Sequence, residues 1–87
     1  MPKVDRADPS YLDKLGHEHG QKSRAYLERT GSIRDGMNDD DAYAVAGQKM
    51  ADVIGWLNHK HEMDWDRLSD RNQQIFMDAW LRGFNRK

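Results

Sequence analysis

Helical spacing of the apolar residues is the feature of this sequence that most limits its fold. In three separate stretches the large apolar residues recur every three or four positions, which places them on one face of an α-helix. No stretch alternates apolar and polar residues as a half-buried strand does. We therefore expect an all-α fold, and three helices in a chain of this length predict a compact three-helix bundle with short loops.

Capping residues set the limits of these helices. Asp8 followed by Pro9 is typical of a helix start, and Gly31 is typical of a residue just after a helix end. Asn38, followed by three aspartates, marks a second start, and Ser69 or an earlier aspartate could mark a third. The predicted helices span residues 9–29, 39–60 and 70–84.

The chain of 87 residues is long enough to enclose one hydrophobic core. Leu, Ile, Val and Phe number only 14, a fraction low enough to suggest disorder. The net charge of -1 lacks the self-repulsion that keeps such chains open, and three Trp, three Tyr and five Met add apolar surface. We expect a single helical domain over residues 9–87, preceded by a flexible N-terminal arm over residues 1–8.

The composition also indicates a compartment. Because the sequence has no cysteine, disulfides and thiolate zinc sites are excluded, which suits the cytoplasm. The first ten residues carry charges where a secretory signal needs an apolar run, and no stretch approaches the ~20 apolar residues of a membrane span. We expect a cytoplasmic protein that is not exported and does not enter a membrane.

Small residues predict a close contact between the first two helices. Gly16, Gly20 and Ser23 share one face of the first helix. Each glycine inside a helix costs about 0.5 to 1 kcal/mol relative to alanine, and close packing is one source of compensation. A matching arc in the second helix consists of Ala44, Gly47, Ala51 and Gly55. We predict that the two faces meet; the alternative is that the glycines kink or split the first helix.

Two His-x-His pairs raise the question of a metal site. His17 and His19 point about 200° apart on an intact helix, so they cannot hold one ion together. His59 and His61 are the better candidates, because the backbone near a helix end could unwind and a carboxylate could join them. The alternative is that these histidines are solvated or complement the helix dipole. We predict no metal and no cofactor.

Aromatic residues suggest a binding surface. The third helix carries an apolar arc wider than a surface helix needs, and Trp56 lies off the main apolar stripe of the second helix. Tryptophan and arginine are frequent at interface hot spots. The predicted partner-binding residues are Trp56, Phe76, Met77, Trp80, Leu81, Arg82, Phe84 and Arg86. The same arc predicts self-association as a dimer or higher oligomer; the alternative is that its aromatic rings form the core of a monomer.

These patterns favour a non-enzymatic function. No nucleophile, base and orienting group can be assembled from the spacing of the polar residues. We predict an adaptor, a regulator or a stoichiometric inhibitor that binds protein, and such a short polar chain is also compatible with phage or mobile-element origin. The C-terminal "WLRGF" resembles the Trp-x-x-Gly-aromatic ending of ribosome modulation factor, and this match of five residues carries no role to the chain.

Nucleic-acid binding is the alternative function. The basic C-terminal helix end offers Arg82, Arg86 and Lys87 beside aromatic residues, which is a pattern found in RNA- and DNA-binding proteins. A sequence pI near 6.4 and the "NDDD" run at residues 38–41, which repels phosphate unless it is turned away, oppose this function.

Overall fold

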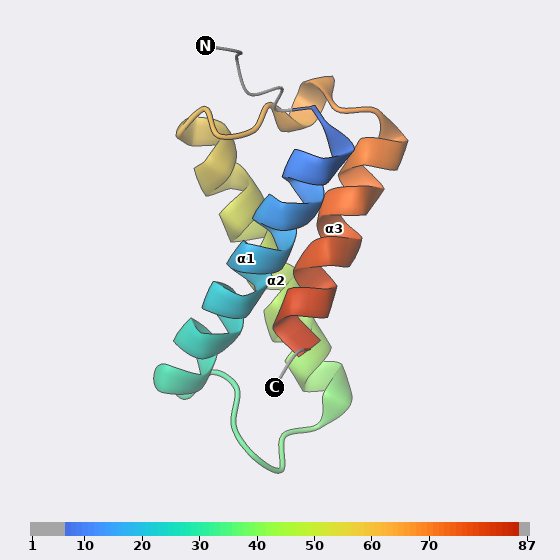
Figure 1. Ribbon diagram of the computed structural model, residues 1–87. Coiled ribbons are helices and arrows are strands. Elements are labelled where there is room, and N and C mark those ends of the chain that lie inside the picture. The colour runs from blue at the N-terminus through green and yellow to red at the C-terminus, as the bar shows by residue number, and fades with distance from the viewer. Residues whose placement is uncertain (1–6, 86–87) are drawn as a thin grey trace.

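The computed structural model describes residues 7–85, which form three α-helices and one short 3₁₀ helix (Figure 1). The bounds are Pro9–Arg29 for α1, Asp39–His59 for α2, Trp65–Arg67 for the 3₁₀ helix η1 and Asp70–Asn85 for α3. The predicted all-α three-helix bundle is confirmed, and every predicted helix limit lies within one residue of the observed one. η1 was not predicted. Of the predicted N-terminal arm, residues 1–6 lie outside the described part of the chain.

Side-chain caps begin all three α-helices. The Asp8 carboxylate accepts a hydrogen bond of 3.0 Å from the backbone amide two residues later, and the Asn38 side chain accepts one of 2.7 Å in the same way. The Ser69 hydroxyl accepts a bond of 3.2 Å from the amide three residues later. Each cap satisfies an amide that has no partner inside its helix, so local sequence fixes where each helix starts.

The C-terminal ends of α1 and α2 have the same geometry. The residue after each cap adopts the left-handed conformation, Gly31 with φ 79° and His61 with φ 60°. The amide that follows donates back to the carbonyl of Leu27 in α1 and of Leu57 in α2, at 2.9 and 3.0 Å. This is the Schellman arrangement, in which glycine is favoured because it has no Cβ. His61 holds the same conformation with a side chain attached.

α1 and α3 lie side by side with their backbones in close contact (Figure 1). Gly16 and Gly20 of α1 and Gly83 of α3 are buried between them. A Cβ placed on Gly16 would lie 2.6 Å from the carbonyl oxygen of Phe76, and one on Gly83 would overlap the carbonyl of His17. Only glycine fits these positions. α1 is helical without interruption over its whole length, so the glycines do not split it.

The predicted contact between the small faces of α1 and α2 is wrong. Gly16 and Gly20 face α3, while Ser23 is buried beside a groove that separates α1 from α2. The small residues of α2 are all exposed, and a Cβ on either glycine among them would meet nothing within 4 Å. They are Ala44, Gly47, Ala51 and Gly55. The reason is that α2 turns its larger side chains inward to fill the core, which directs the opposite, small face outward.

One core joins the three helices. The largest fully buried side chains are Trp80, Phe76, Leu12, Leu57 and Met63, which come from every α-helix and from the segment before η1. The Trp80 ring stacks on the Phe84 ring at 5.0 Å between centroids, and the Trp65 ring meets the Phe76 ring edge-on at 5.8 Å. α2 is therefore held by side-chain packing, whereas α1 and α3 also touch through their backbones.

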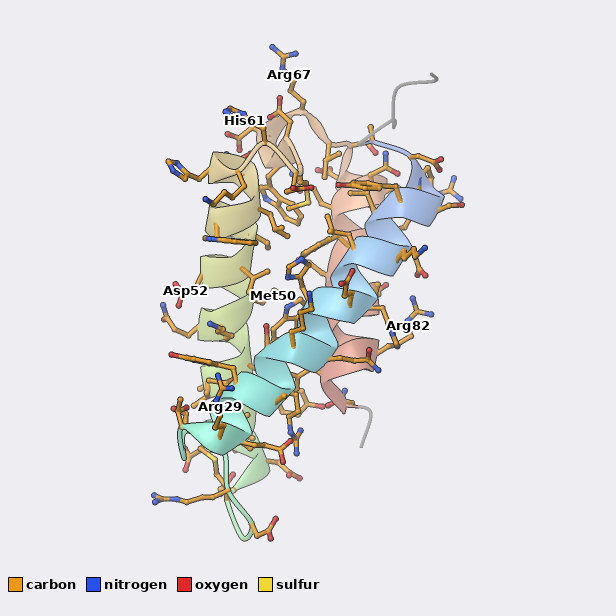
Figure 2. All side chains as sticks on the ribbon, turned by 60° about the vertical axis from the view of Figure 1, so that its left-hand side comes forward. Arg29, Met50, Asp52, His61, Arg67 and Arg82 are labelled. Carbon is orange, nitrogen blue, oxygen red and sulfur yellow. The ribbon has the colours of Figure 1, made fainter. Side chains whose placement is uncertain are left out.

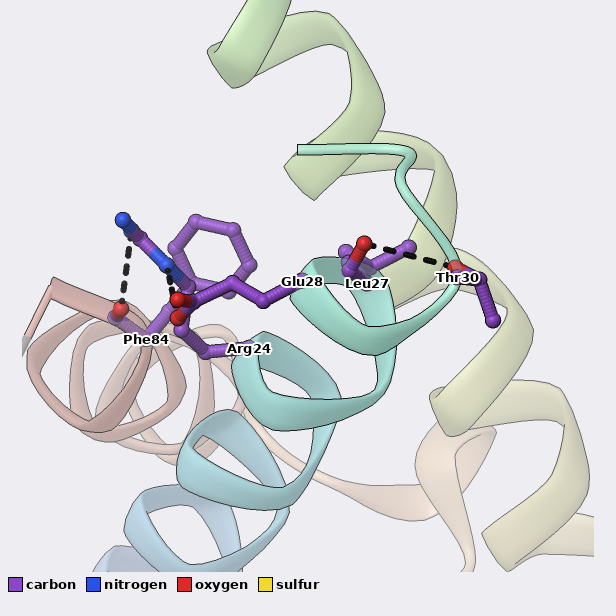
Figure 3. Close-up of polar contacts among 5 residues, drawn as sticks. All are labelled: Arg24, Leu27, Glu28, Thr30 and Phe84. Atoms are coloured by element: carbon purple, nitrogen blue, oxygen red, sulfur yellow. Dashed lines mark hydrogen bonds and ion pairs between the residues drawn. The ribbon is translucent and has the colours of Figure 1, made fainter. Parts of the chain in front are cut away.

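Polar contacts tie the ends of the bundle together. The Tyr11 hydroxyl of α1 donates to the Glu62 carbonyl just after α2, at 2.7 Å. At the other end the Arg24 guanidinium donates to the Phe84 carbonyl at 3.4 Å and to the Glu28 carboxylate at 2.9 Å (Figure 3). Within residues 7–85, no helix combines the length and the apolar composition that crossing a membrane requires.

Candidate protein-binding groove

The aromatic residues of α3 are internal. Phe76 and Trp80 have no exposed surface, and Phe84 is 4% exposed. The prediction that these rings form an exposed binding surface is therefore wrong. The apolar arc of α3 is wide because this helix is covered on two sides, by α1 at the glycine contact and by the side chains of α2 and the preceding segment.

The other predicted interface residues of the third helix are spread over different environments. Met77 and Leu81 are half-buried against the core. Arg82 is exposed and points away from the core (Figure 2), and its guanidinium pairs with the Asp13 carboxylate of α1. Arg86 lies outside the described residues. The structure does not bring these residues together into one surface.

Trp56 is the predicted interface residue that does lie at the surface, with 52% of its area exposed. It stands on α2 beside a groove between α1 and α2, and Tyr26 of α1, 45% exposed, lines the same groove. The groove has a volume of about 480 Å³. Its lining residues are His19, Lys22, Ser23, Tyr26, Lys49, Asp52, Val53 and Trp56.

Ring contacts organise this groove. The His19 ring lies 6.0 Å from the Trp56 ring, centroid to centroid, so the two helices meet there through aromatic groups. The Lys49 ammonium lies 4.3 Å from the centroid of the Tyr26 ring, and the Arg29 guanidinium lies 5.7 Å from the same centroid. Cation–π contacts of this kind fix a ring that is otherwise exposed. The groove therefore combines apolar surface with positive charge from Lys49, which lines it, and from Arg29, which adjoins it through Tyr26.

The histidine that lines the groove, His19, is in its neutral form at neutral pH. Burial lowers the pKa of His19, and the nearby Lys22 ammonium lowers it further, although the carboxylates of Glu18 and Glu62 act in the opposite direction. The His19 imidazole is thus neutral at pH values above 6.5, the ordinary pKa of a histidine. Glu18 has a lowered pKa because it accepts a hydrogen bond from Lys22, with which it forms an ion pair of 3.1 Å.

A second hollow continues the groove along α2 toward its start. It shares Tyr26, Lys49 and Asp52 with the first and adds Val45, Gln48 and Ala44 of α2 together with Leu27 and Ser32. Figure 2 shows Met50 directed between the helices and Asp52 on the outer side of α2, so Asp52 lies where the groove opens to solvent. The two hollows form an elongated surface rather than a closed cavity.

No metal centre emerges from the described side chains. Among residues 7–85, no three His, Asp or Glu side chains gather in a way that could hold an ion. His59 and His61 are exposed, and His61 is the left-handed residue that ends α2.

The sequence pointed to part of this groove and missed the rest. Trp56 was predicted because it lies off the core stripe of α2, and its exposure is confirmed. Tyr26 and His19 were missed as groove residues, since the helical period alone does not say which helix lies opposite them. No protein-family model, no curated protein and no solved structure matched the chain in comparisons with known proteins.

Proposed function

We propose that this protein is a small non-enzymatic protein-interaction module, an adaptor, regulator or stoichiometric inhibitor, that binds its partner in the groove between α1 and α2. The observation that supports this most is the position of Trp56, half-exposed at the edge of an apolar groove. A small domain with little apolar surface to spare would gain stability by burying such a ring. Tryptophan at the edge of a groove is typical of interface hot spots.

The shape of the groove favours a helix or an extended segment as ligand. Apolar side chains of a partner would pack on Val53, between Trp56 and Tyr26, and the continuing hollow along α2 would take the next turn. Self-association was predicted from the α3 arc, whose aromatic rings are internal, so we assign the groove to a different protein. The absence of cysteine supports a place in the cytoplasm for this module.

Nucleic-acid binding has less support. Arg82 of α3 forms an ion pair with Asp13. Arg24 of α1, which lies next to the C-terminal end of α3, binds Glu28 and the Phe84 carbonyl. Both side chains are therefore less available to phosphate groups.

A matched pair of variants tests the proposed function. Wild-type protein, Trp56→Ala and Tyr43→Ala are immobilised, and proteins retained from the host extract are compared and then titrated individually. Tyr43 is the control because it is 62% exposed and lines a different hollow, beside Ile33 and Phe84. We expect a partner that binds wild type and Tyr43→Ala, and that loses about 2 kcal/mol or more of binding free energy, roughly 30-fold in affinity, with Trp56→Ala. A partner that binds all three proteins equally would contradict the proposal, provided circular dichroism shows that Trp56→Ala is folded.

A further inference from the structure

The rim of the groove carries positive charge that the described residues do not neutralise. Arg29 and Lys49 both lie over the ring of Tyr26, at 5.7 and 4.3 Å from its centroid. Within residues 7–85 neither forms an ion pair with a carboxylate. A carboxylate brought close to either cation would therefore be stabilised.

Among the described residues, the carboxylates near the groove do not form ion pairs with Arg29 or Lys49. Glu28 is paired with Arg24 at 2.9 Å, and Glu18 is paired with Lys22 at 3.1 Å. Asp52 is the one carboxylate among the residues that line the two hollows, which also include the cations Lys22 and Lys49. Arg29 adjoins this lining through the ring of Tyr26, so positive charge is in excess there. This excess is found although residues 35–66 as a whole carry a net charge of -6 (two basic against eight acidic side chains).

We propose that the groove binds an acidic amphipathic helix, and this assignment rests on the proposed function above. One face of the ligand helix places apolar side chains beside Trp56 and Val53, and carboxylates next to that face pair with Lys49 and Arg29. The apolar contacts supply most of the affinity. The charge pairs select acidic over basic ligands and orient the helix along the groove.

Three synthetic peptides of about 14 residues, roughly four helical turns, test the assignment. The first places Leu and Phe at helical spacing among glutamates, the second replaces the glutamates by lysines, and the third keeps the glutamates but replaces Leu and Phe by alanine. Each is titrated into isotope-labelled protein while the backbone amide resonances are followed by NMR. We expect the first peptide to bind at least about tenfold more tightly than the second at low salt, with shifts at the groove residues, and we expect the difference to shrink as salt is added.

A charge reversal gives the sharper test. In the double variant Arg29→Glu with Lys49→Glu, we expect the preference to invert, so that the lysine peptide binds more tightly than the glutamate peptide. Arg67→Glu is the control, since Arg67 is an exposed arginine on η1, at the far end of the molecule from Arg29 (Figure 2). It should leave the wild-type preference unchanged. Trp56→Ala should weaken both apolar peptides.

The outcomes separate this inference from the function on which it rests. Equal binding of the two apolar peptides to wild type would overturn the acidic assignment and leave the groove as a protein-binding site. Groove shifts with none of the peptides would overturn both. Equal binding of the alanine peptide, or the same shifts with inorganic phosphate or an oligonucleotide, would show a plain anion site and would also overturn the assignment.

Discussion

Single residues decide how closely the helices of this protein approach. The glycines of α1 and α3 are buried where a methyl group would strike a backbone carbonyl, whereas those of α2 stand in open space. The same residue type therefore has opposite effects on stability at different positions: at the α1–α3 contact it permits packing, and on the outer side of α2 it only weakens the helix.

A matched pair of glycine substitutions tests this contrast. In Gly20→Ala the new methyl would overlap the Trp80 carbonyl, so we expect the free energy of unfolding to fall by about 1–3 kcal/mol. In Gly55→Ala nothing lies within 4 Å of the methyl, and we expect a gain of about 0.5–1 kcal/mol from helix propensity alone. Urea unfolding measures both. A stabilised Gly20→Ala would mean that α1 and α3 are not in backbone contact.

The end of α2 offers a second test at this scale. His61 has φ 60°, a conformation that glycine adopts more readily than any residue with a Cβ. We therefore expect His61→Gly to raise the free energy of unfolding by about 1 kcal/mol. Gly31→Ala, at the equivalent position after α1 with φ 79° and no neighbour within 4 Å, should lower it by a similar amount. A destabilised His61→Gly would indicate that the imidazole makes a contact worth more than the strain.

At the scale of whole elements, the three helices are not held equally. α1 and α3 share a backbone contact in addition to their core side chains, whereas α2 joins the bundle through side chains such as Val53 and Leu57. A groove also separates part of α2 from α1. Elements with fewer such contacts open at lower free energy than the molecule as a whole.

Native-state hydrogen exchange should report this difference. We expect the slowest-exchanging amides in α1 and α3, with protection equal to the global free energy of unfolding, and faster exchange through a partial opening in the middle of α2. The amides near Gly16, Gly20 and Gly83 provide the internal reference. Equal protection in all three helices would show that the bundle opens only as one unit.

The sequence predicted the elements better than their pairing. Helix limits follow from local signals such as Asp8, Asn38 and Ser69, whose caps depend on residues two or three positions away. Which helices touch depends on the whole chain. From the sequence alone, the small face of α1 could pack equally well against the small face of α2 or against Gly83 and Ala79 of α3. Periodicity identifies a face of a helix but not the helix that lies opposite it.

The same limit applied to the candidate site. Trp56 could be identified because it falls outside the apolar stripe of its own helix. Trp80 and Phe84 were assigned to the surface because the arc of α3 was compared with that of a helix covered on one side only. Once α1 covers the glycine side and α2 the other, the whole arc is needed for the core.

At the scale of the whole molecule, acidity should lower the free energy of unfolding. Burial and Lys22 lower the pKa of His19 below its ordinary 6.5, so the folded state binds the proton less readily than the unfolded state. This contribution to stability is complete above the unfolded-state pKa and is lost as the pH falls through the lowered folded-state value. We expect urea unfolding to show a larger loss of stability between neutral and mildly acidic pH for wild type than for His19→Gln. The other three histidines are present in both proteins and serve as the background. Identical pH profiles would show that His19 is not desolvated.

Main-chain atoms are common to every amino acid, so the distance between α1 and α3 depends on the identity of very few side chains. We expect substitutions on the outer surface of this pair to leave its geometry unchanged. α2, by contrast, meets the pair through apolar side chains and supplies one wall of the groove, opposite the wall that α1 supplies. We therefore expect that substitutions of the exposed groove residues of α2 change which partners bind while the geometry of the α1–α3 pair stays constant.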